Sequence, residues 1–145
     1  MKIEKEMVDM VNPYSAYKKQ SVQTMTPVEV VIKLYSEIER QLAIGVSAVE
    51  DTKDIVKANN AFIKAQDCID ALREALDMSV PISNNLEQLY VFFNKEIMKA
   101  NIQKDCTEVK KIIPMIGELR DAFTQISQMT REEIEAQAKA NGTAT

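Results

Sequence analysis

Four stretches of the chain carry apolar residues at alternating steps of three and four, and this spacing restricts the fold more than any other feature. A helix places such residues along one side, so each stretch predicts a helix with one apolar stripe. The stripes are Val28, Val31, Tyr35, Ile38, Leu42, Gly45 and Val49; Ile55, Ala58, Phe62, Ala65, Ile69, Leu72 and Leu76; Leu86, Tyr90, Phe93, Ile97 and Ala100; and Val109, Ile112, Ile116, Leu119, Phe123 and Ile126. Connections this short allow only reversal of direction. We predict an all-α fold, an antiparallel up-down four-helix bundle.

The expected ends of the first two helices follow from capping residues and a proline. Thr26-Pro27-Val28-Glu29 combines an N-cap, a first-turn proline and a capping-box glutamate. Residues 50–54 are a polar break between the first and second helices. Pro81 lies within residues 78–83, where we expect the second helix to have ended, because a proline disfavours helical geometry in the residue before it.

Polar residues mark the expected beginnings of the third and fourth helices. Asn84 and Asp105 are the expected N-caps, with Glu87 and Glu108 three residues after them, and residues 101–104 are the expected connection. Pro114 falls inside the fourth helix, where it removes one backbone hydrogen bond. We expect a kink over residues 110–113.

Residues 1–130 are expected to form one helical-bundle domain, since 145 residues suffice for one core. Within it, residues 12–24 are an N-terminal segment that none of the four stripes requires. Tyr14 and Tyr17, three residues apart, share one face of a helical turn there. We therefore expect a short extra helical piece that acts as a lid, although the two rings could instead belong to the core. Residues 131–145 lose the stripe and are expected to be a frayed polar tail.

The chain offers no group of residues suited to catalysis. It contains no histidine, which excludes histidine phosphotransfer and the histidine-containing di-metal sites of some bundles. Solvated faces account for the carboxylates outside the stripes: Glu37, Glu39, Glu50, Asp67, Asp70 and Glu74. Cys68 and Cys106 are expected to be reduced thiols; Cys106 lies near a helix start, where a thiolate is favoured, but an incidental thiol is the preferred interpretation. We expect no enzyme activity, no metal and no cofactor.

Charge and hydropathy limit the possible partners. The net charge is −4, with basic and acidic residues interspersed, so no basic stripe exists for nucleic acid. No apolar run approaches the length of a membrane span, and residues 1–10 are too acidic for a signal peptide. We expect a cytoplasmic protein without direct membrane insertion, which is a monomer or a weak homodimer when it has no client.

More apolar residues are present than the stripes require. The excess consists of Val30, Ile32, Ile44, Val46, Val56, Ile63, Phe92, Met98, Ile102, Ile113 and Met115. They could broaden the buried face of each helix. Alternatively, several remain exposed and form apolar grooves that capture an amphipathic helix of a partner, a role for which methionine is well suited.

Several short motifs, in order and at their spacing, resemble the flagellin-specific export chaperone family (FliS). They are Asn12-Pro13-Tyr14-x-x-Tyr17, Val22-x-Thr24, Thr26-Pro27-x-Glu29, Leu34-Tyr35, Lys64-Ala65-Gln66, Asn85-Leu86-x-x-Leu89-Tyr90 and Ala100-Asn101. Phe123 stands where the family often has tryptophan. The resemblance implies a chaperone that binds the C-terminal helical segment of flagellin, prevents premature polymerisation, and delivers it to the cytoplasmic domain of a flagellar export-gate membrane protein.

The resemblance also implies which residues serve the client or the lid. They are Tyr14, Tyr17, Val22, Leu34, Tyr35, Leu89, Tyr90, Phe93, Ile97 and Asn101. The residues alone leave other classes open: a helical-bundle adaptor or secretion chaperone for another amphipathic helical client, a bundle with a small-molecule cavity, or a self-assembling coiled coil.

Overall fold

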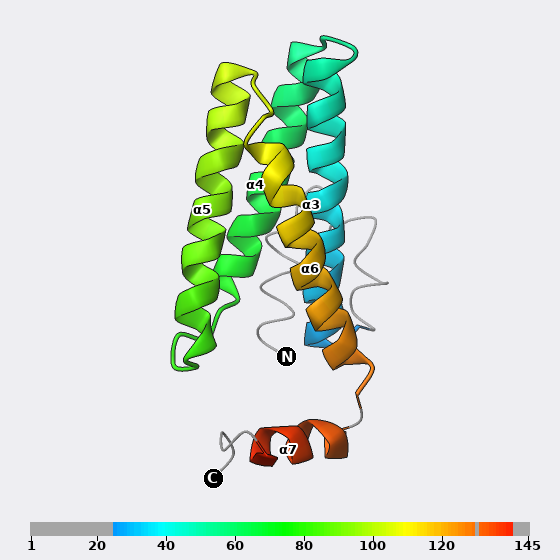
Figure 1. Cartoon of the computed structure of the whole chain (residues 1–145), viewed down its shortest axis with the longest axis vertical. Helices are drawn as coiled ribbons and strands as arrows, with labels where there is room; N and C mark the ends of the chain where they lie inside the picture. The colour runs from blue at the N-terminus through cyan, green and yellow to red at the C-terminus, as the bar shows by residue number, and fades with distance from the viewer. Residues whose placement is uncertain (1–24, 130, 141–145) are drawn as a thin grey trace.

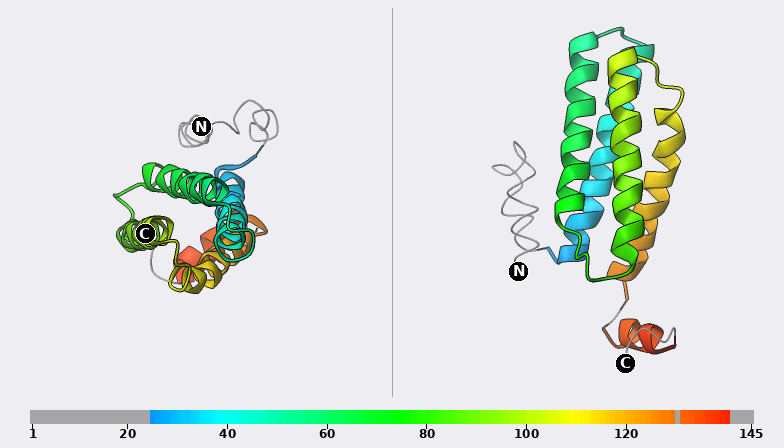
Figure 2. Two further views of the ribbon diagram at one scale, coloured as in Figure 1. Left: turned by 90° about the horizontal axis from the view of Figure 1, so that it is seen from above. Right: turned by 90° about the vertical axis from the view of Figure 1, so that its left-hand side faces the viewer.

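The structure, a computed structural model, describes residues 25–129 and 131–140. Four long helices run alternately up and down: α3 (Pro27–Glu50), α4 (Ile55–Glu74), α5 (Ile82–Gln103) and α6 (Val109–Ser127) (Figure 1). Helix α3 packs against α4 and α6, and α5 closes the ring between them (Figure 2). The predicted all-α, antiparallel four-helix bundle is confirmed. The expected N-terminal lid segment, residues 12–24, lies outside the described residues.

The apolar stripes form the core, and small residues let the helices approach. Leu42, Phe62, Ile69 and Ile97 are completely buried, and Ala58, Ala65 and Ala71 line the buried side of α4. Helix α3 buries more than its stripe, because its contacts with α4 and α6 are the most extensive between the bundle helices: Val30, Leu34 and Ala48 are buried as well. Two stripe residues were wrongly assigned to the core. Ile55 and Ile126 are exposed, and each lies in a terminal turn of its helix.

The capping prediction for α3 is confirmed. The Thr26 hydroxyl oxygen accepts a hydrogen bond from the Glu29 backbone N–H at 3.2 Å and donates one to the Glu29 carboxylate at 3.1 Å. Asp54, at the end of the polar break, caps α4 by accepting from the Lys57 backbone N–H at 3.0 Å. These side chains satisfy donors that a helix start leaves unpaired, so both helices begin at defined residues.

The start predicted for α5 was wrong. Helix α5 begins at Ile82, so Asn84 lies in its first turn and not at its N-cap. Pro81 has a φ of −56°, already helical, and the Val80 carbonyl accepts from the Ser83 backbone N–H at 3.0 Å. The fixed φ of proline suits a helix start, which is why the helix begins earlier than the polar residues suggested.

The connection between α5 and α6 also differs from the prediction. Helix α5 continues through Asn101 to Gln103 and ends where Lys104 adopts the left-handed conformation with a φ of 53°. The Asp105 carboxylate accepts from the backbone N–H and the hydroxyl of Thr107, so it stabilises a turn before α6 and does not cap it. Pro114 lies within continuous α6, and the kink there stays a prediction.

The expected frayed tail contains a helix. Residues Arg131–Ala140 form α7, which lies beyond one end of the bundle (Figure 1). Glutamate, alanine, glutamine and lysine, which dominate this segment, have high helix propensity even without an apolar stripe. The absence of a stripe therefore indicated the lack of a packing face and not the lack of a helix.

Glu37 is a further correction, because it was assigned to a solvated face and is only 7% exposed. Its carboxylate accepts from the Arg40 guanidinium at 2.7 Å and from the Gln41 side-chain amide at 3.0 Å. A buried carboxylate needs such donors, since desolvation of an unpaired charge is costly. Heptad spacing alone does not reveal pairing of this kind.

Candidate helix-docking surface

Five of the ten predicted client-binding or lid residues lie in the core. Leu34, Tyr35, Tyr90, Phe93 and Ile97 are each at most 4% exposed. Leu89 and Asn101 are half-buried, and Tyr14, Tyr17 and Val22 lie outside the described residues. A buried side chain supports a binding surface but touches a partner only if the helices separate. A contact role for these ten residues stays a prediction.

Two of them, Tyr35 and Tyr90, form a polar pair inside the core. Their hydroxyls are hydrogen-bonded to each other, and the Tyr35 ring stacks on Phe123 with centroids 5.6 Å apart. Burial raises the pKa of both hydroxyls above the ordinary value, so both are neutral at physiological pH. The cluster joins α3, α5 and α6 beside an apolar cavity of about 260 Å³ at the end of the bundle.

A ladder of polar side chains connects α4 to α5. Asn101 donates its amide to the Asn59 side chain at 2.8 Å, Gln66 donates to the Asn94 backbone carbonyl at 3.4 Å, and Asn94 donates to the Asp70 carboxylate at 2.8 Å. The two helices lie side by side and antiparallel (Figure 2). These bonds mark the line along which α4 and α5 meet, and they fix the register of the two helices.

Apolar side chains follow the outer edge of this ladder. Ile63 lies between Asn59 and Gln66 in the helical register of α4, and Met98 lies between Asn94 and Asn101 in that of α5. With Val56 on α4, and Val91 and Ile102 on α5, they form a set that we call the α4–α5 stripe. Its members are 43% to 75% exposed. Exposed apolar side chains along two adjacent helices are a typical docking surface for an amphipathic helix.

The excess apolar residues divide between the two interpretations left open by the sequence. As a broadened core face predicts, one of them is buried and four are half-buried: Val30, and Ile32, Ile44, Val46 and Ile113. The other six are exposed, as the second interpretation requires: Val56, Ile63, Phe92, Met98, Ile102 and Met115. Sequence reasoning missed Val91 and the polar ladder. The signal for the ladder was a set of amides and an acid at steps of seven and four: Asn59, Gln66 and Asp70 on α4, and Asn94 and Asn101 on α5.

The other end of the α4–α5 seam is acidic. Arg73 donates to Glu87 across the seam at 2.7 Å and lies 3.7 Å from Asp70. Burial, and secondarily the nearby charge of Asp70, raises the pKa of the Asp67 carboxyl. The Arg73 guanidinium thus lies among the carboxylates of Asp70, Glu74 and Glu87, which favours a basic residue on any partner that extends from the stripe to this end.

The described residues give no support for nucleophilic or metal chemistry. Cys106 is buried, and burial, followed by the charge of Glu50, raises the pKa of its thiol, so the alternative of an activated thiolate was wrong. Within residues 25–129 and 131–140, no three His, Cys, Asp or Glu side chains are grouped to hold a metal ion. None of the helices in this part of the chain combines the length and apolarity of a membrane span.

Comparison with known proteins gives one consistent result. The sequence model of a family described as flagellar protein FliS matches residues 10–130. The flagellar secretion chaperone FliS of Bacillus subtilis (strain 168) is 30% identical over 122 residues, which cover 84% of this chain and 91% of the relative. The flagellar secretion chaperone FliS of Vibrio cholerae serotype O1 (strain ATCC 39315 / El Tor Inaba N16961) is 33% identical over 117 residues, with 77% and 85% covered. The chain belongs to the FliS family of flagellar proteins.

Proposed function

We propose that this protein is a cytosolic export chaperone that binds the C-terminal helical segment of flagellin, prevents its premature polymerisation and delivers it to the flagellar export gate. Family membership and the names of the two relatives support a chaperone role in flagellar secretion. The observation that carries the proposal is the exposed α4–α5 stripe. A client whose own apolar face drives self-assembly is kept apart from its copies when that face lies against such a surface.

The energy available from the stripe argues for an extended contact. Burying the exposed half of five such side chains yields roughly 4 to 8 kcal/mol, taking about 1.5 to 3 kcal/mol for full burial of each. Ordering a disordered partner costs about 2 to 5 kcal/mol or more. Little remains for tight binding from the stripe alone. The client is therefore expected to use further surfaces, including the acidic end of the seam through its basic residues.

The first test is a titration of a flagellin C-terminal fragment, followed by far-UV circular dichroism and fluorescence anisotropy. The fragment should gain helix on binding. The double variant Ile63→Glu/Met98→Glu places two charges on the stripe and should weaken binding by about tenfold or more, because a buried charge without a partner is costly. Met115→Glu/Ile126→Glu is the matched control, with the same residue types and similar exposure on α6.

Three results decide between the alternatives. Absence of binding and of any gain in helix would contradict the proposal. Equal loss of affinity for the fragment in both double variants would show that the fragment does not bind specifically at the α4–α5 stripe. Equally tight binding of an unrelated amphipathic peptide of the same length would favour the broader role of a chaperone for another helical client.

For the export gate, the flagellin-loaded protein is expected to bind the cytoplasmic domain of the gate protein.

We also propose that Tyr14 and Tyr17 act as a lid that competes with the client. The proposal rests on their spacing ahead of a helix that Thr26 caps independently. Tyr14→Ala/Tyr17→Ala should change the affinity for the flagellin fragment while the melting temperature stays nearly constant, because a one- or two-turn segment adds little stability. A large fall in melting temperature with unchanged affinity would instead identify the two rings as part of the core.

A further inference from the structure

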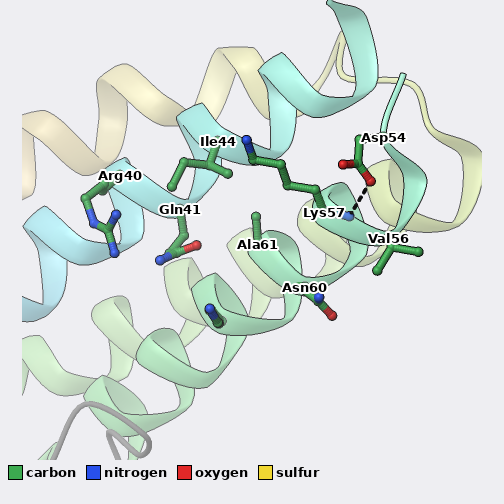
Figure 3. A pocket seen from close by; sticks show the side chains of 9 residues that line it. Arg40, Gln41, Ile44, Asp54, Val56, Lys57, Asn60 and Ala61 are labelled. Atoms are coloured by element: carbon green, nitrogen blue, oxygen red, sulfur yellow. Dashed lines mark hydrogen bonds between the residues drawn. The ribbon is translucent and has the colours of Figure 1, made fainter. Parts of the chain in front are cut away.

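A second surface lies on the other side of α4, between α3 and α4. It is a groove of about 530 Å³, which we call the α3–α4 groove, and it is lined among others by Arg40, Ile44, Lys57, Ala61 and Lys64 (Figure 3). The Lys57 side chain extends from α4 over the groove toward α3 (Figure 3). Val56 lies at the border and belongs to both this groove and the α4–α5 stripe.

The groove is positively charged on an acidic protein. Arg40, Lys57 and Lys64 line it, with Asp54 as the one carboxylate among its lining residues, whereas the whole chain carries a net charge of −4. Arg40 is ion-paired with Glu37 at 2.7 Å, and Asp54 uses its carboxylate to cap α4. Lys57 and Lys64 form no ion pair with any residue of the described ranges. Two ammonium groups are therefore available to a ligand.

The position of Lys57 is unfavourable for its own helix. It lies in the first turn of α4, which has no acidic residue. A helix N-terminus carries a partial positive charge and favours acidic side chains there. Helix stability thus does not explain this lysine, whereas binding of a negatively charged group would.

We propose that the α3–α4 groove binds an acidic amphipathic helix of a partner protein. Lys57 and Lys64 are seven residues apart, two turns of α4, so their positions are separated by about 10.5 Å along the helix axis. Carboxylates seven residues apart on a partner helix match this separation. Ile44 and Ala61 also line the groove and suit an apolar residue on the same face of the partner helix. The acidic remainder of the chain disfavours nucleic acid and anionic lipid.

The experiment uses the full-length protein and a synthetic helical peptide with two glutamates seven residues apart and leucines on the same face. Anisotropy should detect binding that weakens with added salt. Lys57→Glu/Lys64→Glu should reduce the affinity by about tenfold or more, because attraction becomes repulsion at both positions. Lys95→Glu/Lys111→Glu, with the same charge change on exposed sites of α5 and α6, should alter it by less than about twofold.

Further measurements distinguish failure of this proposal from misfolding of the variants and from failure of the flagellin proposal. Lys57→Glu alone should keep or raise the melting temperature, since an acid replaces a cation in the first turn. Ile63→Glu/Met98→Glu should keep its affinity for the acidic peptide while its affinity for the flagellin fragment falls. The proposal is overturned by equal affinity for a peptide with lysines in place of the glutamates, or by no effect of the Lys57/Lys64 reversal. Tighter binding of DNA or anionic vesicles, or self-association abolished by the same reversal, would also overturn it.

Discussion

At the scale of single residues, the packing of Gly45 against Phe62 shows how closely α3 and α4 meet. A Cβ atom on residue 45 would lie 2.6 Å from the Phe62 ring, and that ring is completely buried. Heptad spacing placed Gly45 in the first stripe but gave no reason for a glycine there. The structure provides the reason, because no larger residue fits below the ring unless α3 and α4 move apart.

Gly45→Ala is accordingly expected to destabilise the protein. Overpacking costs about 1 to 3 kcal/mol, against a gain of about 1 kcal/mol in helix propensity, which leaves a net loss of up to about 2 kcal/mol. Gly117→Ala is the control, since its Cβ would meet only the Glu39 carboxylate at an ordinary 3.5 Å. It should raise the free energy of unfolding by up to about 1 kcal/mol. Urea denaturation measures both, and a change of the same sign in the two variants would contradict this account.

At the scale of helices, the Tyr35–Tyr90 pair links α3 to α5 and makes the free energy of unfolding depend on pH in alkaline solution. In the unfolded chain both hydroxyls lose their protons near pH 10.0, whereas in the folded protein their pKa values are raised. Above that pH the folded state binds more protons than the unfolded state. The free energy of unfolding should then fall, by up to about 1.4 kcal/mol per pH unit for each tyrosine.

Tyr35→Phe/Tyr90→Phe should remove this dependence. The wild-type protein and the double variant should show parallel stability up to about pH 9.5 and diverge above pH 10, where only the wild type loses the contribution of the pair. Denaturant titrations at a series of pH values measure the difference between the two curves. Parallel curves through pH 11 would show that burial of the pair has no energetic consequence.

At the scale of the whole molecule, the α4–α5 stripe leaves apolar surface exposed on an otherwise acidic bundle. Without a client, the simplest way to cover it is a second copy of the chain. We expect a monomer or a weak homodimer by analytical ultracentrifugation, because five half-exposed side chains provide too little area for a stable dimer. Ile63→Glu/Met98→Glu should be strictly monomeric. A tight dimer that persists in this variant would place self-association elsewhere.

The fold class, the antiparallel order of the helices and most of the core could be predicted from the sequence, because apolar periodicity and short connections reflect local geometry. It also indicated the cap at Thr26, since capping involves residues three apart. Which surplus apolar residues are exposed depends instead on tertiary packing. Val30 and Ile63 look alike in the sequence, but Val30 is buried in the core, whereas Ile63 remains 43% exposed. The pairing of Glu37, the polar ladder and the α3–α4 groove likewise depend on which helix lies opposite, which spacing within one helix does not encode.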